Sequence, residues 1–214
     1  LNGGTIELGN GLGASGWNGC FTLMGDITVS GSSPSHITQK AGAGASANMQ
    51  MSNGANGVGG TRTITVANVT GDSNPDLIIS GQLIDGTVIK EGLGTVELGT
   101  YVSTASVAVD WVVNAGELRF SNAANDYSYR AITLASGTTL THNGLTDGNE
   151  YFVLNGAVTV SGSVTINESS VANTTGDSKN LFFDGGLKGS GTVTINATNP
   201  GNGVTFRNNS TDFA

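Results

Sequence analysis

The chain has 214 residues, a formal net charge of −8, and 34 glycines against 3 prolines. Only 11% of its residues are charged, whereas ordinary globular domains have about a quarter. We expect no nucleic-acid partner, because 8 Lys and Arg residues in an acidic chain cannot neutralise a phosphate backbone. No run of about 18 apolar residues is present, so we expect no membrane insertion.

Cysteine usage argues against a disulfide or metal framework. Cys20 is the only cysteine, and no Cys/His grouping has the spacing of a structural metal site. We expect a small buried side chain there, since free cysteine is among the most buried residue types. The first residue is Leu rather than Met, which we interpret as a processed or excised segment of an exported protein.

Alternation of β-branched apolar and polar residues predicts short β-strands along the chain. Gly and Asn interrupt nearly every stretch that could form a helix. Each strand can bury one face, because successive side chains point to opposite sides. The expected strands are, in chain order, residues 26–29, 61–66, 95–98, 157–160, 163–166 and 192–195.

Repetition favours a solenoid over a sandwich or a barrel, which short strands alone would also fit. Residues 67–83, ANVTGDSNPDLIISGQL, align with residues 172–187, ANTTGDSKNLFFDGGL, at an offset of 105 (172 − 67 = 105). Smaller units of a turn and a strand recur as NGGTIEL (2–8), NAGELRF (114–120) and GSGTVTI (189–195). Units that recur every 20 to 25 residues, roughly, predict turns stacked in register.

The sequence therefore predicts an all-β fold, a parallel β-solenoid that forms a single domain over residues 1–214. Residues 1–60 are less regular, and 61–214 contain the clearest repeats. Corners need residues that tolerate positive φ, which are chiefly Gly and Asn. The predicted corner residues are Gly92, Gly94, Asn114, Gly116, Gly185 and Gly186. The predicted core residues are Val96, Leu98, Leu118, Phe120, Val158, Val160, Val193 and Ile195.

Residues 88–99, VIKEGLGTVELG, followed by 109–120, VDWVVNAGELRF, resemble the autotransporter-associated β-strand repeat. In that family a Lys and a Gly-x-Gly turn precede one strand, and a second strand ends in an Asn-x-Gly corner. Here Lys90, Gly92, Gly94, Asn114 and Gly116 occupy those positions, and LFFDGGLKGSGTVTI repeats the unit with Lys188 displaced. The resemblance implies a right-handed parallel β-helix in an exported bacterial surface protein, adhesive or stalk-like, without catalytic residues.

Both ends of the sequence fall within turn-strand units, LNGGTIEL and RNNSTDFA. An uncovered solenoid end exposes unpaired backbone groups, which natural solenoids normally cover. We therefore expect these ends to meet another copy, head to tail, or the rest of a longer chain. Head-to-tail contacts need not close, so copies would form an open filament.

Several residues suggest binding or catalysis without forming a complete motif. DSNPD (72–76) resembles the start of a calcium loop but lacks its turn Gly and later Glu, so we predict a turn. His36 and His142 have no accompanying nucleophile motif, and we expect exposed turn histidines. Asp147 and Glu150 are the nearest approach to the paired carboxylates of a polysaccharide-cleaving enzyme.

Two further kinds of surface binding stay open. Outward aromatic residues such as Trp17 and Tyr127 could stack on sugars, although buried aromatic residues fit equally well. Thr-x-Thr pairs at 61–63, 63–65, 139–141 and 192–194 suggest ice or flat-surface binding. Strand propensity explains these threonines as well, and intervening strands place Glu97 and Arg119 where a continuous Thr array would need Thr.

Taken together, these patterns predict a non-catalytic extracellular β-solenoid at the bacterial cell surface, with a structural or adhesive role. The expected partners are copies of itself, the rest of a longer chain, or surface glycans, and no cofactor or metal is expected. The alternatives are polysaccharide binding or cleavage and, less favoured by the residues, ice binding.

Overall fold

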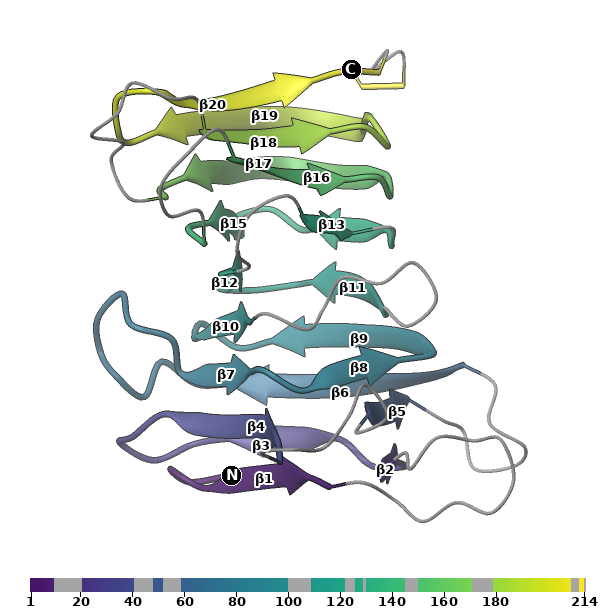
Figure 1. Ribbon diagram of the computed structural model, residues 1–214, viewed down its shortest axis with the longest axis vertical. Coiled ribbons are helices and arrows are strands. Elements are labelled where there is room, and N and C mark those ends of the chain that lie inside the picture. Colours follow the sequence, from purple (N-terminus) through teal and green to yellow (C-terminus); the bar gives the residue numbers. More distant parts are fainter. Residues whose placement is uncertain are drawn as a thin grey trace.

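The computed structural model describes residues 1–9, 21–40, 48–51, 59–99, 109–121, 126–128, 130–144, 150–170, 179–208 and 212–213. Within these ranges the secondary structure consists of β-strands, and no helix that could cross a membrane occurs. The strands stack in parallel along the long axis of the molecule, as Figure 1 shows. The prediction of an all-β parallel β-solenoid is confirmed.

The strands lie on three faces, which we name A, B and C. Face A contains β1 (Thr5–Leu8), β4 (Ser35–Gln39), β7 (Leu77–Ile79), β10 (Thr95–Leu98), β12 (Glu117–Phe120) and β15 (Thr139–His142). Face B contains β3 (Ile27–Val29), β6 (Gly60–Val66), β9 (Gly86–Glu91), β11 (Asp110–Val113) and β14 (Ile132–Leu134). The long strands β17 (Val158–Glu168) and β19 (Leu187–Ala197) begin on face B and end on face A.

Face C consists of two separate sheets. The first contains β2 (Phe21–Leu23), β5 (Asn48–Met51) and β8 (Gln82–Ile84). The second contains β13 (Asp126–Ser128), β16 (Glu150–Leu154), β18 (Lys179–Phe183) and β20 (Asn202–Phe206). In a complete turn the chain passes from face A through face C to face B.

Turn lengths vary while the strand register stays constant. Ile37 pairs with Ile79, 42 residues further along (79 − 37 = 42), whereas Ile79 pairs with Leu98 after only 19 (98 − 79 = 19). Later turns are more even, since Leu98 pairs with Phe120 after 22 residues (120 − 98 = 22). The described residues 67–76, which lie outside the strands, account for part of the longer turn, and the inward positions stay aligned.

Inward side chains form continuous apolar columns. On face A, the aligned residues Ile37, Ile79, Leu98 and Phe120 are all at most 2% exposed. Stacked turns thus bury Val, Ile, Leu and Phe at about 25 cal/mol per Å² of apolar area, which is the main favourable term for this fold. Of the predicted core residues, those that are buried are Val96, Leu98, Leu118, Phe120, Val158 and Val160.

Ile195 differs from the prediction that it is a core residue. It aligns with the buried Ile166, but 44% of its surface is exposed. Val193 aligns with Val164 and is only half-buried. Both lie on β19, and no described strand pairs with its other edge on face A, so the next layer of side chains is missing there.

The glycine corners combine two separate steric requirements. Gly92, Gly116 and Gly186 have positive φ, of 78°, 70° and 79°. Gly94 and Gly185 do not, but a Cβ at Gly94 would lie 2.4 Å from the carbonyl oxygen of Ala67, and Gly185 is similarly crowded. These glycines are needed because backbones of successive turns approach closely.

Asn114 does not adopt the positive φ that the sequence suggested. Its side-chain amide instead donates a hydrogen bond to Oε1 of Glu91 (2.7 Å), in the preceding turn. Among the described residues other than glycine, Asp85 alone has positive φ, 53°. Asn therefore serves this corner through side-chain hydrogen bonding, not through backbone conformation.

The long sequence repeat does not correspond to a structural repeat. Residues 77–79 of the first copy form β7 on face A, whereas residues 181–183 of the second copy lie in β18 on face C. The shorter units NGGTIEL, NAGELRF and GSGTVTI all place their strands on face A. The shorter unit of a turn and a strand is thus the one that the fold repeats.

A comparison of Gly92→Ala with Gly137→Ala tests the crowding of the corners. Both glycines have positive φ, but a Cβ at Gly92 would lie 2.3 Å from the carbonyl oxygen of Val66, whereas Gly137 has open space. We expect Gly137→Ala to cost about 1 kcal/mol, from φ alone, and Gly92→Ala about 3 kcal/mol or more. Denaturant unfolding measures both, and equal costs would contradict the crowding argument.

Candidate functional site

Lys90 occupies an inward position on face B, between Ile64 and Val113 of the neighbouring turns. Its side chain is fully buried, and its Nζ donates hydrogen bonds to the carbonyl oxygens of Gly92 (2.8 Å) and Ala115 (2.7 Å). The first bond stays within the turn of Lys90, and the second reaches the next turn. Lys90 therefore joins two successive corners.

Burial lowers the pKa of Lys90 from its ordinary value of 10.5 to about 8. The negative charges of Asp76, Glu117 and Glu91 act in the opposite direction and favour the charged form. Desolvation is the larger of the two effects, since an ammonium group without water loses much of its hydration energy. The closed surroundings of Nζ indicate a structural role, because no solvent or substrate reaches it.

Asp76 is the buried anion of the same corner. Its Oδ1 accepts hydrogen bonds from the backbone N–H groups of Val69 (2.7 Å) and Thr70 (2.8 Å), and its Oδ2 accepts one from Thr95 N–H (2.8 Å). Val69 and Thr70 follow β6 on face B, while Thr95 begins β10 on face A. One carboxylate thus joins the loop after β6 to the face A strand of the following turn.

The segment 72–76 forms a turn, as predicted, and its acids are engaged in local hydrogen bonds. Asp72 accepts hydrogen bonds from the backbone N–H and the side-chain amide of Asn74, both at 2.8 Å. The backbone hydrogen bond is the main cause that lowers the pKa of Asp72. Within the described ranges, no group of three or more His, Cys, Asp or Glu could hold a metal ion.

His142 and Glu168 form a buried pair on face A. They are aligned at inward positions of successive turns, both are fully buried, and His142 Nδ1 lies 2.7 Å from Glu168 Oε2. The imidazole stacks on the ring of Phe152, with centroids 4.9 Å apart. The prediction of an exposed turn histidine is wrong for His142, because the alternation of β15 carries it inward.

Ser170 completes a group that resembles a catalytic triad only in composition. Its Oγ lies 3.5 Å from His142 Nδ1, the same nitrogen that contacts Glu168. In a working triad the nucleophile and the carboxylate contact opposite ring nitrogens. Here Nε2 is buried without a hydrogen-bond partner, so the arrangement cannot relay a proton from Ser170.

The remaining candidates from the sequence do not form a described site. His36 is a half-buried outward residue of β4 and not a turn residue, so that prediction is also wrong. Cys20, Trp17 and Asp147 lie outside the described residues. Glu150 and Tyr127 belong to β16 and β13, whose backbones are described without these two side chains.

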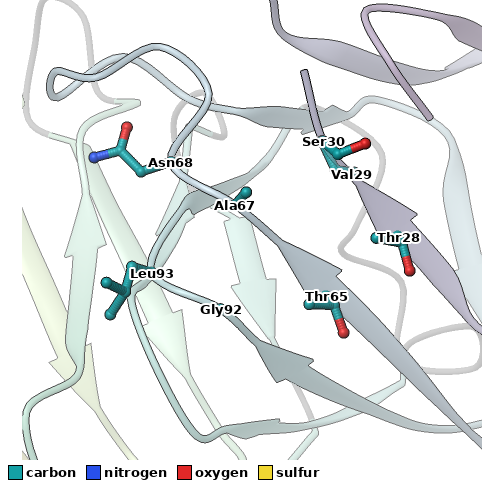
Figure 2. A pocket seen from close by; sticks show the side chains of 8 residues that line it. All are labelled: Thr28, Val29, Ser30, Thr65, Ala67, Asn68, Gly92 and Leu93. Carbon is teal, nitrogen blue, oxygen red and sulfur yellow. The ribbon is translucent and has the colours of Figure 1, made fainter. Parts of the chain in front are cut away.

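A shallow pocket of about 400 Å³ lies on face B beside the Lys90 corner. Figure 2 shows Thr28 and Thr65 on one side of it, and Asn68 and Leu93 on the other. Leu93, at the tip of the Gly-x-Gly turn, is 78% exposed. None of the residues that line the pocket is charged, so it offers apolar contact and no acid or base.

The outward side chains of face A change character along the solenoid. Near the middle, Arg119 forms ion pairs with Glu97 (3.6 Å) and Glu117 (2.9 Å). The column of Glu97 and Arg119 continues through Thr141 to two asparagines: Asn167 donates to Thr141 (3.2 Å), and Asn196 donates to Asn167 (3.0 Å). At the aligned positions of the next two turns, Thr139 is followed by Thr165 and Thr194, whereas Thr141 is followed by Asn167 and Asn196. Only one of the two Thr columns of β15 therefore continues.

No family model, no curated protein and no solved structure matches this chain. The features described above define a β-solenoid whose buried charges join successive turns. The resemblance to the autotransporter-associated repeat stays a prediction.

The stability of the protein should depend on pH through Lys90. Between pH 8 and 10.5 the folded protein has lost the Lys90 proton while the unfolded chain still carries it, so stability rises with pH. The rise has an upper limit of about 3 kcal/mol, at about 1.4 kcal/mol per pKa unit, and stops above the unfolded pKa. In the Lys90→Met variant, the free energy of unfolding should not show this rise between pH 8 and 10.5. The same pH profile in the variant and the unmodified protein would contradict the role of Lys90.

A double-mutant cycle tests the buried pair of His142 and Glu168. Glu168→Leu removes the acceptor of the Ser170 backbone N–H and the hydrogen-bond partner of the imidazole Nδ1, and we expect a loss of about 3 kcal/mol. When His142→Leu is added, the combined loss should be smaller than the sum of the two single losses by about 1 to 3 kcal/mol. Strict additivity in denaturant unfolding would show that the pair is not coupled.

Proposed function

We propose that this chain is a non-catalytic structural or adhesive β-solenoid of a bacterial cell surface or an extracellular fibre. The observation that carries the proposal is the use of the buried ionisable groups. Lys90, Asp76, His142 and Glu168 lie at the interior or at a corner, and their hydrogen bonds connect successive turns or successive faces. These groups stabilise a shaft and face no substrate.

The outer surface supports the same role. Its strands present Thr and Asn columns with side chains that hydrogen-bond along the solenoid axis, as between Asn167 and Asn196. Such columns are polar, which suits an exported shaft that must stay hydrated. The resemblance of residues 88–120 to the autotransporter-associated repeat favours a surface location and adhesion, with glycans among the candidate ligands.

Antibody labelling of intact cells of the source bacterium tests the location. We expect labelling without permeabilisation, in parallel with a cytosolic protein that labels only after permeabilisation. Labelling that required permeabilised cells would contradict a surface role.

Incubation with pectin, alginate and other polysaccharides tests the absence of catalysis. We expect neither reducing ends nor unsaturated products, because the buried carboxylates Asp76 and Glu168 form structural hydrogen bonds. Product formation would favour the polysaccharide-cleaving alternative and would make Asp147 and Glu150 the first residues to replace.

A further inference from the structure

The two ends of the described solenoid carry complementary strand edges. β1 on face A and β2 on face C each have one strand neighbour, and so do β20 on face C and the face A part of β19. Figure 1 shows β1 and β2 near one end of the molecule and β19 and β20 at the other. Among the described strands, each end therefore has an unpaired backbone edge on the same two faces.

The direction of the backbone groups on face A is the same in every turn. The carbonyl oxygens of the inward residues Ile37, Leu98 and Phe120 accept hydrogen bonds from the following turn, from Ser80, Ser121 and Asn143. In parallel strands the N–H and C=O of one residue face the same neighbour, and successive residues alternate. Inward residues on this face thus always direct their backbone groups toward the C-terminal end.

The open edges follow this rule. Thr198 N–H donates to Glu168, so by alternation Val193 and Ile195 direct their backbone groups away from β17, toward the open edge. At the other end, the carbonyl oxygen of Leu8 accepts a hydrogen bond from the backbone N–H of Lys40, which follows β4. Because successive residues alternate, Thr5 and Glu7 direct their backbone groups away from β4, toward the open edge of β1. Pairing of Val193 with Ile6 and of Ile195 with Leu8 would match hydrogen bonds and inward side chains together.

Face C offers a second matched pair of edges. Arg207 N–H donates to Phe183, so Val204 and Phe206 direct their backbone groups toward the open edge of β20. On β2, Phe21 and Leu23 align with the fully buried Met49 and Met51 and are therefore inward residues, yet Phe21 is 49% exposed. Both ends thus expose apolar side chains at inward positions. Within the solenoid, such side chains are covered by the next turn.

We propose that a second copy of this chain docks head to tail, with its β1 on β19 and its β2 on β20. The contact repeats the register that joins turns within one molecule, so each added copy recreates the same open edge. This inference does not depend on the adhesive role, since it concerns only the ends. The experiment below uses these 214 residues alone and tests whether copies of them associate through these edges.

Two single substitutions block opposite ends. Ile195→Lys places a charge in the β19 edge, and Phe21→Lys places one in the β2 edge; both side chains are already nearly half exposed, so the fold should be kept. The control is Leu93→Lys, which also replaces an apolar side chain with a charged one. Leu93 lies at a lateral corner, away from both ends, and is 78% exposed. Circular dichroism and thermal unfolding establish that each variant is folded.

Sedimentation from micromolar to millimolar concentration gives the result. We expect the unmodified chain and Leu93→Lys to grow in mass with concentration, and each end variant to stay monomeric alone. An equimolar mixture of Ile195→Lys and Phe21→Lys should form dimers, because each retains the end that the other has lost. A monomeric unmodified chain overturns the proposal, and so do end variants that assemble normally, a mixture that stays monomeric, or loss of assembly in Leu93→Lys.

Discussion

The in-register stacking of parallel strands is the constraint on which the rest of this structure depends. A residue on any face shares its column with the aligned residues of every other turn, and its backbone groups face the same direction as theirs. A single substitution therefore acts on two neighbouring turns at once. Substitutions at the corners have the largest effect. There the backbones of successive turns are so close that no Cβ fits at Gly92, Gly94 and Gly116.

Buried charges are placed where this constraint leaves backbone groups without strand partners. At the Lys90 corner, turn carbonyls of two successive layers converge on one ammonium, and Asp76 accepts the N–H groups of the loop and of β10. A buried ion is weak evidence for stability, since its desolvation offsets much of the attraction. Its hydrogen bonds are directional, however, so Lys90 favours one alignment of the corners over a shifted one. In the turn of β19 the same column position is occupied by Gly189, and Lys188, one residue earlier, is an exposed outward residue.

The sequence was sufficient for the fold class because two local signals, alternation and glycine turns, are enforced by every turn of a solenoid. Alternation also assigns His142 and Glu168 to inward positions. They lie two residues after the inward Leu140 and Ile166, in the stretches TLTH (139–142) and VTINE (164–168). Their inward positions were nevertheless not predicted, because glutamate and histidine side chains are usually expected at the surface. The contacts of Asp76 with Thr95 and of Lys90 with Ala115 could not be predicted, because they join segments whose separation depends on loop lengths. The offset of 105 residues between the two long sequence repeats does not match a structural repeat for the same reason. The turns range from 19 to 42 residues in length (98 − 79 = 19; 79 − 37 = 42).

The same constraint separates what the interior and the surface of this protein can do. Inward positions are fixed by the column to which they belong, so their chemistry is committed to stacking, even where the residue is a histidine, a glutamate or a lysine. Outward positions carry no such requirement, and there the columns change from the Arg119 ion pairs to the Asn ladder without any change in register. Adjacent turns place outward side chains about 4.8 Å apart, so a partner of a strand face meets a regular array of side chains. The shallow pocket on face B lies beside the Lys90 corner and has no charged lining residue. Such a surface offers many weak and repeated contacts to a molecule that binds it.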